Sequence, residues 1–182
     1  MQSVRIVFLC CRSFRLNFTV MTGIFFGSTT GSTEAAAAKI AERLGIAPPD
    51  VHNVADTPAE KVKEYDLLLL GSSTWGAGEL QDDWSVFLPR LKEVDLSGCR
   101  VALFGCGDAG VYGDTFCDAM AEIRDGLASS GCLFVGELEA SEYEGCCSRI
   151  CRDGKVIGWA IDESASEAEN EMRMELWVAA IG

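Results

Sequence analysis

Three segments of the chain share one pattern, in which a continuous apolar run is followed by a glycine and then by small polar residues. They are residues 23–28, 66–73 and 100–107. Strands that are apolar on both faces are typical of a sheet covered on both sides, and such sheets are parallel. Weaker strands are expected at residues 50–54, 132–136 and 156–161. The pattern therefore predicts a buried parallel sheet.

Apolar residues at helical spacing fall between the predicted strands, around residues 37–44, 84–91, 116–127 and 167–180. Regular alternation of strands and helices predicts an α/β fold, a doubly wound five-stranded parallel sheet with helices on both faces. Residues 139–155 interrupt the last strand, so we expect an insertion that splits it in two. In such folds a ligand binds beyond the carboxyl ends of the strands. We expect a single domain over residues 21–182.

The first strand runs into a loop rich in hydroxyl groups that opens a helix. The loop consists of Ser28, Thr29, Thr30, Gly31, Ser32 and Thr33. The N-terminus of a helix offers free N–H groups and a partial positive charge, which attract anions. With no Lys or Arg in the loop, the arrangement suits a phosphate monoester held by neutral donors. It matches neither the nucleotide P-loop nor G-x-G-x-x-G, and simple helix capping is the alternative.

The second and third strands end in loops that carry aromatic residues. Trp75 is flanked by small residues and glycines, so it is expected as a stacking platform for a planar ring, the alternative being a Trp folded onto the surface. Trp84, at helical spacing, is expected in the core. In the third loop, glycines allow close approach of the backbone to a ligand, and Tyr112 offers a second aromatic face; a flexible turn is the alternative. The predicted cofactor residues of these two loops are Ser73, Thr74, Trp75, Gly76, Cys106, Gly107, Asp108 and Tyr112.

Together the three loops describe a site for a flat ring that bears a phosphate, without an evident nucleophile–base pair. The single histidine, His52, falls on the second predicted strand, away from these loops. No catalytic triad and no metal cluster stand out. Any chemistry at this site is therefore expected to belong to a cofactor.

The net charge of −13 argues against nucleic acid and anionic membranes as partners and favours basic protein surfaces, with simple solubility as the alternative. No stretch is apolar and long enough to span a membrane. The nine cysteines are odd in number, and several lie in apolar segments, which favours reduced thiols and a cytoplasmic location. Cys146, Cys147 and Cys151 match no metal motif; redox-sensitive thiols are the favoured alternative there.

Residues 1–20 contain three arginines and no acidic residue. A signal peptide would need a longer apolar core and a cleavage site, and an organelle transit peptide would usually be longer. Because the first strand begins directly after Met21, we expect the true start at Met21, with residues 1–20 an artefact of start-site choice or disordered.

These loops resemble those of the flavodoxin family. Residues 28–33 are similar to the phosphate loop of that family. Thr74-Trp75, followed by Gly78-Glu79-Leu80-Gln81, is similar to the loop that places a Trp on one face of the flavin. Residues 105–112 are similar to the loop that places a Tyr on the other face. The interrupted fifth strand resembles the long-chain subgroup. The resemblance implies the strand order 2-1-3-4-5. Ser32, at a variable position of the loop, and the N-terminal extension depart from the family pattern.

The resemblance implies a low-potential one-electron carrier, not an enzyme, that uses non-covalent FMN and shuttles between semiquinone and hydroquinone. Its expected partners are redox proteins, namely a basic-surfaced reductase and low-potential acceptors, and it is expected to be a monomer. Acidic residues near the flavin would lower the potential by disfavouring the anionic reduced ring. The alternatives are an FMN-dependent NAD(P)H:quinone or flavin reductase on the same fold, and a fold relative that binds no flavin.

Overall fold

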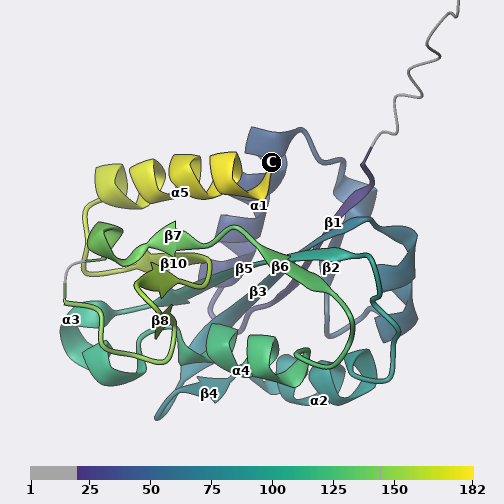
Figure 1. The fold of residues 1–182 in the computed structure, drawn as a ribbon, viewed down its shortest axis with the longest axis horizontal. Coiled ribbons are helices and arrows are strands. Elements are labelled where there is room, and N and C mark those ends of the chain that lie inside the picture. Colours follow the sequence, from purple (N-terminus) through teal and green to yellow (C-terminus); the bar gives the residue numbers. More distant parts are fainter. Residues whose placement is uncertain (1–19, 144) are drawn as a thin grey trace, which may run out of the picture.

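A parallel sheet forms the centre of the computed structural model, which describes residues 20–143 and 145–182 (Figure 1). The strand order is β10-β5-β3-β1-β2, and every neighbouring pair along it is parallel. The strands are β1 (Thr22–Gly27), β2 (Val51–Asn53), β3 (Leu67–Trp75), β5 (Arg100–Gly107) and β10 (Trp159–Asp162). The predicted parallel sheet and the implied order are confirmed. The expectation for residues 1–20 lies outside the described residues, Val20 excepted.

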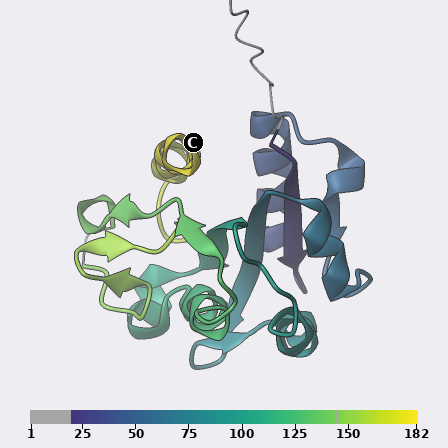
Figure 2. The same ribbon diagram turned by 45° about the vertical axis from the view of Figure 1, so that its right-hand side comes forward.

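The fifth strand is split, as predicted. β6 (Leu133–Val135) pairs with the start of β5, whereas β10 pairs with its end. The chain between them forms a small antiparallel sheet of β7 (Leu138–Glu139), β9 (Lys155–Val156) and β8 (Cys151–Arg152). Figure 2 shows these short green and yellow-green strands apart from the main sheet. The strand predicted over residues 156–161 is therefore wrong in extent, because its first residue belongs to the small sheet.

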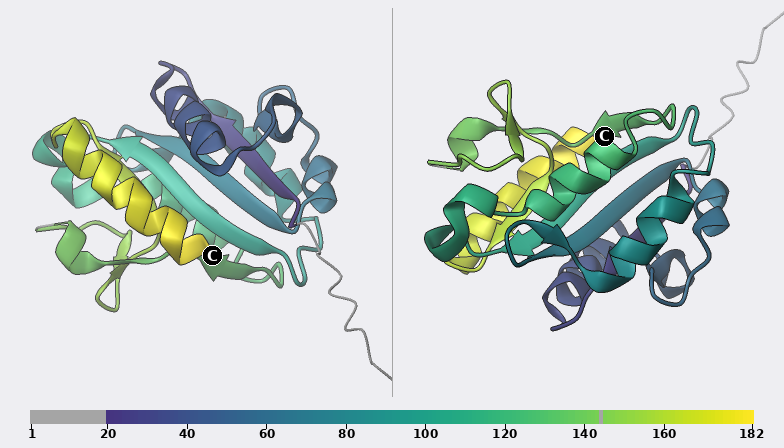
Figure 3. Two further views of the ribbon diagram at one scale, coloured as in Figure 1. Left: turned by 90° about the horizontal axis from the view of Figure 1, so that it is seen from above. Right: turned by 90° about the horizontal axis from the view of Figure 1, so that it is seen from below.

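Helices cover both faces of the sheet, as Figure 3 shows from above and below. α1 (Ser32–Leu44) and α5 (Glu167–Ile181) lie on one face, and α2 (Asp82–Leu91) and α4 (Asp118–Gly126) on the other. The connection from β2 to β3 departs from the predicted alternation, because it holds a six-residue 3-10 helix, η2 (Ala59–Glu64), instead of an α-helix. The other short elements are η1 (Pro48–Asp50), β4 (Glu79–Leu80), α3 (Ala109–Tyr112), η3 (Gly113–Thr115) and η4 (Ala140–Glu142).

The core forms where the apolar strands meet these helices. Leu68, Leu69 and Leu70 of β3 are fully buried. Gly71 follows them at a point where a side chain would collide with the core, since a Cβ there would lie 2.1 Å from Cζ of Phe104. Trp84 is fully buried, as predicted, and its Nε1 donates a hydrogen bond to the carbonyl oxygen of Gly71 at 2.6 Å. This bond ties α2 to the strand that leads into the second loop.

The cysteines fall into two groups. Cys146 and Cys151, in the cluster where redox-sensitive thiols are the favoured expectation, form a disulfide. The free cysteines of the described residues are Cys99, Cys106, Cys117, Cys132 and Cys147, which agrees with the prediction for those in apolar segments. None of the helices in the described part of the chain combines the length and apolar character needed to cross a membrane.

Candidate functional site

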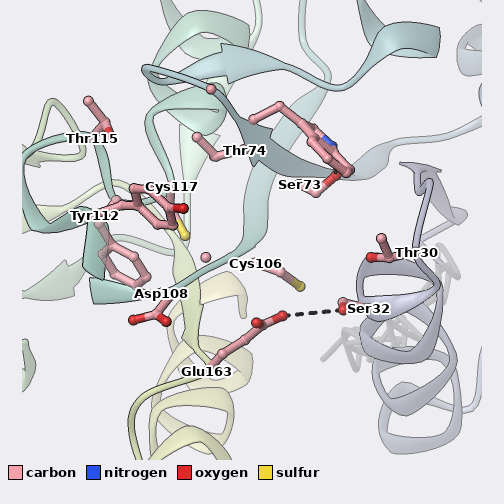
Figure 4. A pocket seen from close by; sticks show the side chains of 14 residues that line it. Thr30, Ser32, Ser73, Thr74, Cys106, Asp108, Tyr112, Thr115, Cys117 and Glu163 are labelled. Carbon is pink, nitrogen blue, oxygen red and sulfur yellow. Dashed lines mark hydrogen bonds between the residues drawn. The ribbon is translucent and has the colours of Figure 1, made fainter. Parts of the chain in front are cut away.

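A cavity of about 320 Å³ opens at the carboxyl edge of the sheet, where the loops after β1, β3 and β5 meet (Figure 4). Parallel strands end at the same edge, so loops far apart in sequence come together there. The residues that line the cavity are Thr30, Ser32, Ser73, Thr74, Trp75, Gly76, Cys106, Gly107, Asp108, Tyr112, Thr115, Phe116, Cys117 and Glu163. Ten of these were predicted from the sequence, and all three predicted loops contribute.

Four predicted residues of the first loop lie outside the lining, and they shape the loop. The Oγ of Ser28 accepts a hydrogen bond from the backbone N–H of Gly31 at 3.1 Å. The Oγ1 of Thr29 accepts one from Nε2 of Gln81 at 3.3 Å, which joins the loop to the start of α2. Thr33, the second residue of α1, is fully buried. The loop therefore uses part of its hydroxyl groups to hold its own shape.

The N-terminus of α1 is open to an anion. Gly31 takes the N-cap position with φ of 96°, a left-handed conformation that favours glycine, and none of the described side chains caps this helix end. The Oγ1 of Thr33 is buried and has no hydrogen-bond partner in the described part of the protein. Unpaired N–H groups and a buried hydroxyl normally require partners. A phosphate group fits this donor set, and the lining contains no Lys or Arg that would bind it through charge.

Two exposed aromatic residues stand at the ends of the second and third loops. Trp75 ends β3 with 43% of its surface exposed, and its Nε1 donates to Oγ of Ser73 at 3.1 Å. Tyr112 ends α3 with 59% exposed. Figure 4 shows Tyr112 and Asp108 across the pocket from Thr30 and Ser32. Large aromatic surfaces that remain in contact with solvent beside a cavity are suited to stacking on a planar ring.

The start of α4 supports both aromatic loops from behind. The backbone N–H of Ala119 donates to Oγ1 of Thr74 at 3.3 Å, next to Trp75. Gly78, at the far end of the Trp75 loop, lies so close to Asp118 that a Cβ would be 3.1 Å from its side chain. The Tyr112 loop continues through η3 directly into the same helix end. The separation of the two aromatic loops is thus set by one helix.

Comparison with known proteins agrees with this geometry. A family profile described as flavodoxin matches residues 24–177. Flavodoxin 1 of Escherichia coli strain K12 is 44% identical over 162 residues, which cover 88% of this chain and 92% of that protein. The chain belongs to the flavodoxin family. The flavodoxin of Haemophilus influenzae is 39% identical over 86% of this chain and 91% of its own length. A crystal structure of Fusobacterium nucleatum flavodoxin bound to flavin mononucleotide matches with a TM-score of 0.76 and 27% identity, over 87% of this chain and 94% of that one.

Sequence reasoning missed four residues that line the cavity of this chain. Thr115, Phe116 and Cys117 come from the segment between Tyr112 and α4, part of which was predicted as helix. No sequence signal distinguishes them. Glu163 directly follows β10, and the rule that ligands bind at the carboxyl ends of parallel strands would have located it.

The polar groups of the cavity are neutral or acidic. Burial raises the pKa of Cys106 to about 12 and holds that of Cys117 well above its usual range, so both remain neutral thiols. Glu163 accepts a hydrogen bond from Oγ of Ser32 through its Oε1 at 3.3 Å (Figure 4). His52 lies on β2, where its Nε2 is 2.7 Å from the hydroxyl of Tyr65, and it does not line the cavity. The described residues contain no group of three or more His, Cys, Asp or Glu that would hold a metal ion.

Proposed function

We propose that this chain carries single electrons at low potential with FMN bound non-covalently in the cavity. The observation that carries the proposal is the uncapped, cation-free N-terminus of α1 that shares one cavity with Trp75 and Tyr112. Relatives of 39–44% identity are named flavodoxins, and the Fusobacterium nucleatum flavodoxin has been solved with flavin mononucleotide. When bound, FMN supplies the reversible one-electron chemistry.

In this proposal the first loop holds the phosphate. The N–H groups of the first turn of α1 and the hydroxyls of Thr30, Ser32 and Thr33 are the donors. Ser28 and Thr29 fix the loop through the contacts described above, and Gly31 turns the chain into the helix. Such an arrangement binds a phosphate through fixed dipoles instead of a mobile side-chain charge.

The flavin ring is proposed to lie between Trp75 and Tyr112. The remaining predicted residues would contact its edge: Ser73, Thr74, Gly76, Cys106, Gly107 and Asp108. The buried aromatic and thiol groups exclude water from part of the cavity, and exclusion of water strengthens electrostatic interactions inside it. The only charged residues of the lining are Asp108 and Glu163. Both are acidic, so they disfavour the addition of negative charge to the site and would lower the potential.

The proposed partners are redox proteins, a basic-surfaced reductase and low-potential acceptors, and the proposed location is the cytoplasm. The net charge of −13 supports basic docking surfaces. About half of the surface of Trp75 and of Tyr112 is exposed to solvent. A partner that docks on these two side chains would therefore approach the flavin ring without a substrate channel. We propose that the chain works as a monomer.

Stepwise reduction with dithionite, followed by visible absorption, tests the function. One FMN per chain and two resolved one-electron steps are expected. A single two-electron step, or steady NAD(P)H oxidation by the protein alone, would favour the reductase alternative. Trp75→Ala should weaken FMN binding and shift the potential. The matched control is Val86→Ala, an exposed apolar residue of α2 that does not line the cavity.

A further inference from the structure

A loop closed by the Cys146–Cys151 disulfide lies against the outer side of the cavity wall. The disulfide spans six residues, and within them Ile150 is fully buried, which anchors the loop on the protein. The last residue of this loop begins β8, which lies between α3 and α4 in Figure 1. We refer to residues 146–151 as the disulfide loop. Both cysteines of the bridge are partly exposed, so the bond is within reach of a reductant.

The disulfide loop holds the cavity wall through two hydrogen bonds on either side of one residue. The Oγ of Ser148 donates to the carbonyl oxygen of Phe116 at 2.8 Å, in a buried position. The backbone N–H of Arg149 donates to Oδ1 of Asp118 at 2.9 Å. The residue between these two anchor points is Cys117, which lines the cavity.

Cys117 has an unfavourable backbone conformation. Its φ is 54°, one of two positive values among the non-glycine residues of the described chain. Such conformations cost on the order of 1–3 kcal/mol and persist only where the surrounding structure holds them. The bonds from Ser148 and Arg149 to the two neighbours of Cys117 supply that support. The same helix end also carries the Trp75 loop, through Thr74. Loss of the anchors would therefore affect both aromatic loops.

We propose that the Cys146–Cys151 disulfide is a redox modification site whose reduction by a protein dithiol loosens the cavity wall and speeds release of the flavin. A thiolate of the dithiol attacks one sulfur of the bridge and forms a mixed disulfide, and the second thiol of the partner then displaces the protein cysteine. Two electrons and two protons pass to Cys146 and Cys151, and the partner leaves as a disulfide. The effect on the flavin rests on the function proposed above.

Cys147 places a third thiol beside the bridge, and a neighbouring carboxylate disfavours its thiolate form. Its Sγ donates to Oδ1 of Asp114 at 3.3 Å. This hydrogen bond to a carboxylate raises the pKa of Cys147 above its ordinary value. Because the thiolate is the form that attacks disulfides, internal exchange between Cys147 and the bridge is suppressed. Reduction of the bridge therefore requires an external dithiol.

The test compares FMN release from the oxidised and the reduced holoprotein. The holoprotein is incubated anaerobically in the dark with or without dithiothreitol, thiols are counted by alkylation and mass, and release is followed by the rise of FMN fluorescence. Release is expected to be about tenfold faster after reduction. The Cys146→Ser/Cys151→Ser double variant should release FMN at the fast rate with or without reductant. Cys132→Ser, at a free cysteine outside the disulfide loop, should behave as the unchanged protein.

Equal release rates from the two states, with reduction confirmed by the thiol count, would overturn the proposal. Amide hydrogen exchange on the protein without FMN separates this failure from that of the proposed function. Faster exchange at residues 113–119 after reduction supports a loosened wall even if FMN does not bind, in which case the proposed function fails. Unchanged exchange there overturns the modification site itself. Incubation with a reduced protein dithiol in place of dithiothreitol must give the same thiol count, or the proposed partner class is wrong.

Discussion

Glu163→Gln should tighten the binding of FMN. The carboxylate of Glu163 lines the cavity and accepts a hydrogen bond from Ser32, the first residue of α1. A phosphate held at that helix end would therefore face a like charge. Glutamine keeps the size and the acceptor oxygen and removes the charge, so the change isolates the electrostatic contribution.

The size of the effect follows from the hydrogen bond. Both the carboxylate and a phosphate oxygen would lie next to the Ser32 hydroxyl, which donates its single proton to one of them at a time, so the two charges would be about 6 Å apart. Two like unit charges at that distance repel by about 0.7 kcal/mol at the dielectric constant of water and by about 2.8 kcal/mol at an effective value of 20. Glu163 is exposed, so solvent screening favours the lower end of this range. The expected gain in affinity is roughly three- to tenfold.

The assay is a titration followed by the quenching of flavin fluorescence, with FMN and with riboflavin, which lacks the phosphate. Affinity for riboflavin should stay within about twofold, and the gain for FMN should shrink as salt is added. Glu60→Gln removes the same charge from an exposed position on η2 and serves as the control. An equal gain for riboflavin would show that the effect does not involve the phosphate. Weaker FMN binding would show that the carboxylate acts by orienting Ser32, and either result refutes the reasoning.

Two further predictions concern the stability of the fold. Gly71→Ala should lower the free energy of unfolding by about 1–3 kcal/mol, because the new Cβ would collide with Phe104. Gly113→Ala should change it little, because none of the described residues beyond its chain neighbours lies within 4 Å of its Cβ position. Urea unfolding measures both, and equal losses would contradict the packing argument. Burial, aided by the charge of Lys61, lowers the pKa of His52 below 6.5. The unfolded chain therefore binds the proton more readily, and stability should fall as pH drops below 6.5. His52→Gln should remove this part of the pH dependence between pH 8 and 5, and an unchanged slope would assign it to other groups.

The sheet and its core were predictable because a strand that is buried on both faces requires a continuous run of apolar residues. Residues 67–70 are four leucines in succession, and the structure buries every one of them. Trp84 was placed in the core by its helical spacing, and the exposed Trp75 was distinguished from it by its small neighbours. The loops of the cavity followed from the same strands, since the carboxyl ends of parallel strands share one edge.

The parts that could not be predicted depend on contacts between distant segments. Thr115, Phe116 and Cys117 line the cavity because the chain turns before α4 at Cys117, which has a left-handed backbone conformation. The residues around this cysteine in the sequence do not predict that conformation. The pairing of Cys146 with Cys151 depends on how the insertion folds back on itself as a small sheet. Three nearby cysteines allow several pairings, and spacing alone does not choose among them.

A single helix end supports both aromatic loops, so the width of the space between Trp75 and Tyr112, here called the slot, depends on one element. Thr74 and Gly78 on one side, and the segment after Tyr112 on the other, meet at the first residues of α4. Substitutions at the tips of the loops can alter what touches the ring while the width of the slot is conserved by the helix behind them. The fold thereby separates two properties that selection would otherwise change together, the retention of the cofactor and the tuning of its potential. Variation among relatives should accordingly be freer at the loop tips than at the beginning of α4.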